Sequence, residues 1–132
     1  MFNTGLFSSA SPHWRTPEAL YDELNREFIF TLDPCPLGGV DGLERSWAGE
    51  RVFCNPPYGR RVGAWFEKRH EAILSVYLVP SRTDTAWWHD HVLKATQIRF
   101  IRGRLRFNGA KINAPFPSAI VIYENWANGR KD

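Results

Sequence analysis

Residues 52–60 read VFCNPPYGR, an apolar run that passes directly into an amide, two prolines, a tyrosine and a glycine. The apolar run predicts a buried strand that ends at Cys54. Pro56 and Pro57 each fix φ and lack a backbone donor, so the residues after the strand should form a stiff loop with outward-facing carbonyls. A plain rigid turn would explain the prolines, but it has no need of an asparagine and an aromatic ring at a strand end.

Apolar runs and helical patterns alternate outward from this corner in both directions. Strands are predicted at 28–32, 51–54, 75–80, 97–103 and 118–124, and helices at 15–28, 62–74 and 83–95. Thr16 is expected to cap the first helix with Pro17 at its first position, and Thr83 or Asp84 is expected to cap the third. Continuously apolar strands that alternate with helices predict an α/β fold, with a mostly parallel sheet covered by helices on both faces.

The composition is that of a small globular protein. The chain has 132 residues, of which 43% are hydrophobic, and a formal net charge of +3. This length predicts one domain at 13–132, after a flexible arm at 1–12 that lacks periodicity. The mild positive charge is compatible with a polyanionic partner. The chain has no apolar run of about 18 residues, no leader pattern and only Cys35 and Cys54, so we expect a soluble cytoplasmic protein with free thiols and no membrane span.

The corner at 55–58 offers the chemistry of an amine-binding site. The side-chain oxygen of Asn55 and the carbonyl of Pro56 are two acceptors at a fixed separation, which suits the two N–H donors of an exocyclic amino group. Binding the amine in this way orients its lone pair for attack on an electrophile. Tyr58 adds a flat face on which an aromatic base can stack. Asp33 and Asn55 both follow predicted strands, and ligands of α/β sheets bind at the carboxyl ends of strands.

These residues resemble a known catalytic loop. NPPY at a strand end is similar to the loop of S-adenosylmethionine-dependent amino-methyltransferases, which methylate adenine N6, cytosine N4 or a glutamine amide. The wider set WRTPEALYDEL, FIFTLDPCP, VFCNPPYG, LVPSRTDTAWWHD, IRFIRGRLRF and PSAIVIY resembles the phage-type DNA N-6-adenine methyltransferases of the Dam family, over residues 14–123. The resemblance implies a trimmed Rossmann-like methyltransferase fold and S-adenosylmethionine as cofactor. It also implies a phage or prophage gene product in the bacterial cytoplasm, which shields phage DNA from restriction.

The resemblance also implies where the cofactor binds. Its pocket would be lined by Trp14, Thr16, Pro17, Asp33, Pro34, Cys35 and Trp47. Free N–H groups at the start of the first helix suit the cofactor's carboxylate, and Asp33 can accept hydrogen bonds from ribose hydroxyls or from the ammonium group. Simple helix capping and an Asp-Pro turn are the alternative interpretations. DPCPLGG lacks the tight Gly-x-Gly spacing of the common cofactor loop, so Trp47 either stacks on the adenosine as a missing wall or packs in the core.

A basic segment follows the predicted strand at 97–103. Arg102, Arg104 and Arg106 alternate, so on a strand they would share one face, suited either to phosphates or simply to solvent. Phe107 or Trp126 would buttress a base. Adenine N6 is inaccessible inside a duplex, so the target nucleotide of double-stranded DNA would have to flip out. The expected nucleic-acid contacts are Arg60, Arg61, Arg102, Arg104, Arg106, Phe107 and Lys111.

The leading hypothesis is an adenine-specific, site-specific DNA-methyltransferase in which Asn55, Pro56, Pro57 and Tyr58 form the catalytic corner. Transfer would run directly to nitrogen without a cysteine nucleophile. Two alternatives stay open: the same chemistry on RNA adenine, cytosine N4 or protein glutamine, and a non-catalytic methyltransferase-like module that binds nucleic acid. No separate target-recognition domain fits in this length, so we expect short or relaxed recognition, a homodimer or a partner protein. His89 and His91 face different ways on a helix, so no metal site is expected.

Overall fold

A four-stranded sheet forms the centre of the protein, in a computed structural model that describes residues 14–35 and 41–129. The arm expected at 1–12 lies outside the described residues. The strands are β1 (Arg51–Cys54), β2 (Leu74–Pro80), β3 (Gln97–Phe100) and β4 (Ser118–Glu124), in the spatial order β1-β2-β4-β3. The last strand in sequence therefore lies in the interior of the sheet, and β3 lies at its edge.

The sheet is mixed, so the prediction of a mostly parallel sheet is wrong. β1 and β2 are parallel, with Cys54 opposite Tyr77. β4 runs antiparallel to both of its neighbours, because Val121 lies opposite Tyr77 of β2 and opposite Ile98 of β3. Parallel neighbours need a crossover connection, which a helix provides between β1 and β2 but not between β3 and β4. Burial on both faces makes a strand continuously apolar whatever its direction, so the apolar pattern alone did not distinguish the two arrangements.

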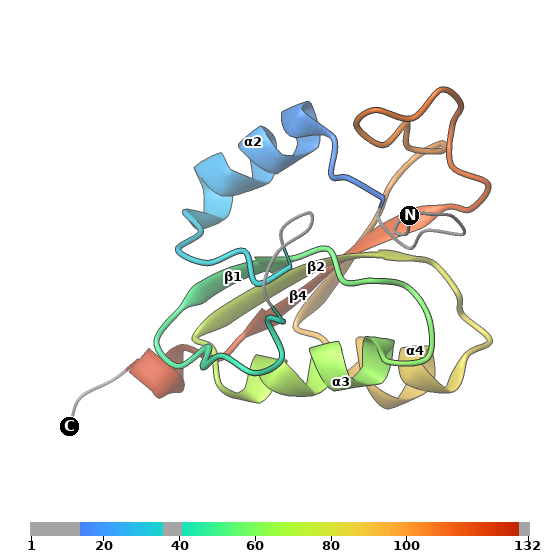
Figure 1. The fold of residues 1–132 in the computed structure, drawn as a ribbon. Helices are drawn as coiled ribbons and strands as arrows, with labels where there is room; N and C mark the ends of the chain where they lie inside the picture. Colours follow the sequence, from blue (N-terminus) through green and yellow to red (C-terminus); the bar gives the residue numbers. More distant parts are fainter. Residues whose placement is uncertain (1–13, 36–40, 130–132) are drawn as a thin grey trace.

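Helices cover both faces of the sheet, as the sequence predicts, and complete a small α/β domain. Figure 1 shows α2 (Glu18–Phe28) on one face, and α3 (Val62–Glu67) and α4 (Ala86–Asp90) on the other. Three short 3-10 helices complete the set of helices in the described residues: η1 (Lys68–His70), η2 (Val92–Lys94) and η3 (Trp126–Gly129). Within the described residues, no helix is long and apolar enough to cross a membrane.

Alternate strand residues supply two separate cores. The core under α2 includes Leu24, Phe28, Phe53, Leu74, Val76, Leu78, Ile120 and Ile122. The core under α3 and α4 includes Phe66, Trp88, Val52, Cys54, Tyr77, Val79 and Val121. Successive side chains of a strand point to opposite faces, so β2 and β4 contribute to both cores. The fully buried β2, with all seven residues inside, holds the two layers together.

The predicted strand at 28–32 is largely absent. α2 continues through Phe28, whose side chain is buried in the core, and it ends at Ile29, which has a left-handed φ of 54°. The Asn25 side chain accepts a hydrogen bond from the backbone N–H of Phe30 at 2.8 Å, so this N–H has a partner just after the helix ends. Leu32 makes a single parallel bridge with Val52. The pairing beside β1 is therefore one residue long, because the helix uses the start of the apolar run.

Both predicted helix caps are displaced. Pro17 itself is the N-cap residue of α2, its carbonyl accepts from the N–H of Tyr21 at 3.0 Å, and no side chain caps this helix. Thr16 is engaged elsewhere, as described below. α4 is capped by Thr85, whose hydroxyl accepts from the N–H of Trp88 at 3.2 Å, rather than by Thr83 or Asp84. Pattern reading locates the start of each helix but misses the capping residue by one or two positions.

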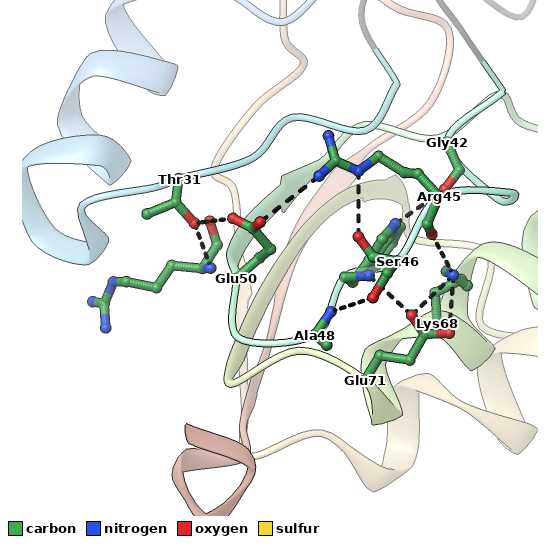
Figure 2. A network of polar contacts seen from close by, with 10 residues as sticks. Thr31, Gly42, Arg45, Ser46, Ala48, Glu50, Lys68 and Glu71 are labelled. Carbon is green, nitrogen blue, oxygen red and sulfur yellow. Dashed lines mark hydrogen bonds and ion pairs between the residues drawn. The ribbon is translucent and has the colours of Figure 1, made fainter. Parts of the chain in front are cut away.

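Polar contacts fasten the loop at 41–50 to the end of α3 and to η1 (Figure 2). The Lys68 ammonium donates to the carbonyl of Arg45 at 2.7 Å and pairs with Glu71. Glu71 in turn accepts from the backbone N–H of Trp47 at 2.9 Å, and the indole of Trp47 donates to the carbonyl of Gly42 at 3.0 Å. Each end of the loop is thus held by directional bonds, and Trp47 is held in the interior.

Candidate active site at the end of β1

The corner at 55–58 follows β1 at the edge where the parallel strands β1 and β2 both end. Asn55 is half-buried, Pro56 is buried, and Pro57 and Tyr58 are half-buried. The carboxyl ends of parallel strands are the usual ligand sites of α/β sheets. The residues that the sequence assigns to catalysis therefore occupy the edge of the sheet where a ligand is expected.

The side-chain amide of Asn55 is held on both sides. Its Nδ2 donates to the carbonyl oxygen of Trp14 and to Oγ1 of Thr16, the latter at 3.0 Å. Its Oδ1 accepts from the hydroxyl of Tyr58 at 3.0 Å. The nitrogen therefore faces the segment at 14–16, and the oxygen faces Tyr58. The two contacts of the nitrogen join residues that are 41 and 39 positions apart, and nothing in the local sequence indicates them.

The hydroxyl of Tyr58 lies inside the protein while its ring is half-buried. Besides Asn55, the hydroxyl can donate to the carbonyl of Leu78 at 3.3 Å, and the ring meets Phe116 edge-on at 5.7 Å. Burial above all, with a smaller contribution from Cys54 and Cys35 once these ionise at alkaline pH, raises the pKa of Tyr58 well above its usual value. Tyr58 is therefore a hydroxyl donor at any physiological pH. Its contact with Asn55 is a feature that the sequence reasoning missed.

An aromatic cluster and a cavity lie next to this corner. Trp14 packs against Phe107 and Phe116, with ring centroids 5.4 Å apart in both pairs. A cavity of about 250 Å³ is lined by Trp14, Arg15, Phe107, Asn108, Gly109 and Ala110. Asn55 does not line the cavity. Trp14 connects the two, because its carbonyl accepts from Asn55 and the residue also lines the cavity. Two segments far apart in sequence thus meet beside Asn55.

Phe107 and Trp126, the two candidates for buttressing a base, lie in different places. Phe107 belongs to the aromatic cluster and lines the cavity. Trp126 lies under the guanidinium of Arg51, which is 5.1 Å from its ring centroid. Arg51 is the first residue of β1 and Asn55 follows the last one, so Trp126 lies at the end of β1 that is remote from Asn55. The geometry therefore favours Phe107, although only 1% of this residue is exposed and its ring face is closed in this conformation.

The expected cofactor residues at 33–35 form a tight turn near the end of β1. Oδ1 of Asp33 accepts from the backbone N–H of Cys35 at 3.2 Å. Asp33 is exposed as a residue, but its carboxyl group is shielded by the loop, and this desolvation raises its pKa despite the opposing effect of the Cys35 bond. Its charge also raises the pKa of Tyr21 and of Cys54, so it lies within electrostatic range of α2 and of the strand that leads to Asn55.

Neither cysteine is activated as a nucleophile. Burial, with the nearby charges of Asp33 and Asp41, raises the pKa of Cys35 to about 11. Complete burial raises the pKa of Cys54 well above its usual value. Thiolates are the reactive form of cysteine, and both groups remain thiols at neutral pH. This chemistry agrees with a reaction that needs no covalent enzyme intermediate.

Trp47 packs in the core, which favours the core-packing interpretation over a wall of the cofactor pocket. Its side chain is fully buried, with 0% of the residue exposed, and it packs near Trp65 and Tyr77. Its indole N–H is already bonded to Gly42. Since neither ring face is open, Trp47 cannot stack on an adenosine in this conformation, and core packing, the alternative interpretation, describes it. Composition alone does not distinguish a buried tryptophan from an exposed one.

The arginines at 102–106 do not form a strand face, because β3 already ends at Phe100. The chain from 101 to 117 is irregular, and Arg102, Arg104 and Arg106 are exposed while Phe107 is buried. The inward and outward alternation is thus retained without strand pairing. Arg106 donates to the carbonyl of Lys111 at 2.8 Å, which closes the turn between these two residues. Exposed cations therefore line this loop, and Arg60 and Arg61 are also exposed just after the corner.

Arg82 is a residue that the sequence reasoning did not assign. It follows β2 by two positions, and its exposed guanidinium lies 5.6 Å from the ring centroid of Phe116. Phe116 contacts both Tyr58 and Trp14, so Arg82 covers the aromatic cluster from the solvent side. Within residues 14–35 and 41–129 it has no carboxylate partner. Its position directly after an apolar strand that ends at the same edge is the signal that points to it.

Comparison with known protein families gives a match over nearly the whole chain. A protein-family model described as DNA N-6-adenine-methyltransferase (Dam) matches residues 4–131, which is nearly the whole chain. Searches of curated proteins and of solved structures found no match.

Proposed function

Because the chain belongs to the Dam family of DNA N-6-adenine-methyltransferases, we propose that it transfers a methyl group from S-adenosylmethionine to N6 of an adenine flipped out of double-stranded DNA. The observation that carries the proposal is the oriented amide of Asn55 at the carboxyl edge of β1. An amide whose nitrogen is held by the protein offers its oxygen to a substrate amine. The alternative acceptors, RNA adenine, cytosine N4 and a glutamine amide, would use the same arrangement, so the choice of DNA adenine rests on the family.

The proposed chemistry needs two acceptors for one amine. Oδ1 of Asn55 and the carbonyl of Pro56 accept the two N–H groups of adenine N6, and no donor among the described residues reaches the Pro56 oxygen. Holding both N–H groups raises electron density on the nitrogen and directs its lone pair. Bound S-adenosylmethionine supplies a methyl group on a positively charged sulfur. Methylation would place a positive charge on the amine, and its extra proton would pass to solvent by way of one of the two acceptors, Oδ1 of Asn55 or the Pro56 carbonyl.

The donor set of this chain fits S-adenosylmethionine in part. Oδ2 of Asp33 has no hydrogen-bond donor among the described residues, and it is free to accept from a ribose hydroxyl or an ammonium group. The start of α2 after Pro17 has free N–H groups, and its capping side chain is absent, which suits a carboxylate. Pro34 and Cys35 complete the turn that carries Asp33. We exclude Trp47 from this set for the reason given above.

The cavity beside Trp14 suits a single base. At about 250 Å³ it falls just below the ~300–1,000 Å³ of sites for drug-sized ligands, so it does not hold a base and a cofactor together. Of its two aromatic residues, Trp14 is half-buried and Phe107 is buried, so Trp14 is the one placed to stack on a base here, and Asn108 provides an amide. Extruded bases are commonly held between aromatic side chains and read by polar groups. We therefore propose that the flipped adenine passes this cavity on its way to Asn55, with Tyr58 and Phe107 as its aromatic neighbours.

Exposed cations on two sides of the corner would hold the DNA backbone. They are Arg60, Arg61, Arg102, Arg104, Arg106 and Lys111, with Arg82 added by the structure. Phosphate contacts position a duplex without reading its sequence. Recognition of the target is thus proposed to be short or relaxed, or to depend on a homodimer or partner. The proposed setting is the cytoplasm of a bacterial host, with the gene carried by a phage or prophage.

Methyl transfer from tritiated S-adenosylmethionine to separate pools of DNA, RNA and protein tests the proposal. Label in DNA that is recovered as N6-methyladenine supports it, whereas label in RNA, in cytosine or in protein supports the corresponding alternative acceptor. Asn55→Ala should abolish transfer and leave cofactor binding by calorimetry nearly intact. Asn125→Ala is the matched control, because this asparagine follows β4 and no hydrogen bond of its side chain occurs among the described residues. Transfer at the wild-type rate by Asn55→Ala would refute the assigned role. No heat of binding at millimolar cofactor would favour a non-catalytic module.

A further inference from the structure

Thr16 touches the catalytic amide rather than capping the helix that it precedes. Its Oγ1 lies 3.0 Å from Nδ2 of Asn55, and the carbonyl of Trp14 accepts from the same nitrogen. α2 has no side-chain cap, so the hydroxyl is not used at the helix start. Both acceptors come from the three residues that precede the N-cap. A short segment thus provides the complete hydrogen-bonding environment of one end of the Asn55 amide.

An asparagine amide can be turned by half a rotation about its last bond, and the two orientations have nearly the same shape. With the nitrogen outward, Asn55 would offer donors to adenine N6, which is itself a donor. With the oxygen outward, it offers an acceptor. The carbonyl of Trp14 can only accept, so it repels the amide oxygen and favours the second orientation. The Thr16 hydroxyl accepts from the nitrogen in that orientation and adds a second contact to it. A methyl group in place of the Thr16 hydroxyl would keep the volume, leave the preference set by the Trp14 carbonyl, and remove one of the two contacts that hold the nitrogen end of the amide.

The oxygen end of the amide is held in a reversible way. Its donor, the hydroxyl of Tyr58, has a second acceptor in the carbonyl of Leu78 at 3.3 Å. The hydroxyl carries one proton and can therefore move to Leu78 when a substrate amine arrives at Asn55. The nitrogen end has no such exchange, since its two protons are matched by two acceptors. The contacts therefore hold the nitrogen of the Asn55 amide in place and leave its oxygen free to accept from the substrate amine.

We propose that Thr16 is a positioning residue that, together with the Trp14 carbonyl, holds the nitrogen end of the Asn55 amide in place, so that the oxygen faces the amine to be methylated. The proposal rests on the proposed function for the identity of that amine. It differs from a role in binding S-adenosylmethionine, because the Thr16 hydroxyl acts on Asn55 and not on the cofactor. The two roles predict opposite kinetic behaviour, which makes them separable.

Steady-state methyl transfer to a DNA duplex distinguishes these roles. Thr16→Val should lower kcat about five- to tenfold, corresponding to the loss of one typical hydrogen bond, with KM for S-adenosylmethionine unchanged. Thr16→Ser keeps the hydroxyl and should restore kcat to within about twofold, since the contact is retained. Thr96→Val is the matched control, because it also removes a threonine acceptor, the one bonded to the N–H of Glu124 at 2.9 Å, away from the corner. A rise in KM for S-adenosylmethionine with kcat unchanged would overturn the proposal.

A measurement on the resting protein keeps the proposal testable without activity. In asparagine-labelled protein, the side-chain NH₂ signal of Asn55 is identified as the one missing from Asn55→Ala. We expect both of its protons to exchange slowly in the wild type and in Thr16→Ser, and one of them to exchange faster in Thr16→Val. Equal exchange in wild type and Thr16→Val overturns the anchoring. If wild type transfers no methyl group to DNA while the exchange pattern is as expected, the proposed function fails and the positioning of Asn55 stands.

Discussion

Replacing Tyr58 by phenylalanine separates the two parts that this side chain plays at the corner. Its hydroxyl has one proton for two acceptors, Oδ1 of Asn55 at 3.0 Å and the carbonyl of Leu78 at 3.3 Å. A hydrogen bond contributes about 1 kcal/mol net, and leaving a buried acceptor unpaired costs about 1–3 kcal/mol. We therefore expect Tyr58→Phe to lower the free energy of unfolding by about 1–2 kcal/mol. The ring and its edge contact with Phe116 should be unchanged.

Methyl transfer should respond differently from stability. In Tyr58→Phe the substrate amine has no hydroxyl to displace from Asn55, so kcat/KM for DNA should stay near the wild-type value or rise. Tyr58→Ala removes the ring as well. Because stacking on a base is worth about 1–3 kcal/mol, kcat/KM should then fall about 5- to 150-fold.

Two assays on the same three proteins check this reasoning. Urea denaturation followed by tryptophan fluorescence gives the free energy of unfolding, and tritium transfer to a duplex gives kcat/KM. If Tyr58→Phe loses as much kcat/KM as Tyr58→Ala, the hydroxyl rather than the ring is needed, and the stacking role is refuted. If both variants transfer methyl groups as fast as wild type, Tyr58 does not contact the base at all.

Three further predictions concern pH, salt and backbone strain. Burial and the charge of Arg69 lower the pKa of His91, so the imidazole takes up its proton at a higher pH in the unfolded protein than in the folded one. The contribution of His91 to the free energy of unfolding should therefore be complete above about pH 6.5 and fall as the pH drops below it, and His91→Gln should flatten this pH dependence in urea titrations. Arg82→Ala should reduce the slope of log affinity against log salt for duplex DNA by about 0.9, the value of one phosphate contact, whereas Arg26→Ala in the last turn of α2 should leave it unchanged; equal slopes in all three proteins would remove Arg82 from the interface. Ile29→Gly should raise the free energy of unfolding by about 1 kcal/mol, because glycine adopts a φ of 54° without strain, and an unchanged urea midpoint would contradict that conformation.

Local patterns predict the corner and most of the strands well. The strands at β1, β2 and β4 are short apolar runs bounded by turn residues, and the structure has them within one residue of the predicted ends. The position of Asn55 after a buried strand follows from the same local signal. These features depend on residues that are close together in the sequence, so a local sequence pattern is enough to predict them.

Features that depend on distant contacts were not predictable in this way. The direction of β4 depends on its connection, although the lack of a helical pattern at 101–117 is a signal for an antiparallel return. The arginines of this loop lack a neighbouring strand, and the burial of Trp47 depends on Glu71 and Gly42. The bond between Thr16 and Asn55 spans 39 residues, and no spacing rule relates them.

The position of β4 between β2 and β3 sets the order of events when the chain is made. β2 and β3 do not pair with each other, and only residues 118–124 join them. Until these residues leave the ribosome, the edges of β2 and β3 that β4 covers in the finished sheet are both open, and the sheet is not continuous. Such edges are templates for pairing with other chains, and pairing of distant segments is slow. Early termination before residue 118 should therefore yield aggregates rather than a smaller folded protein.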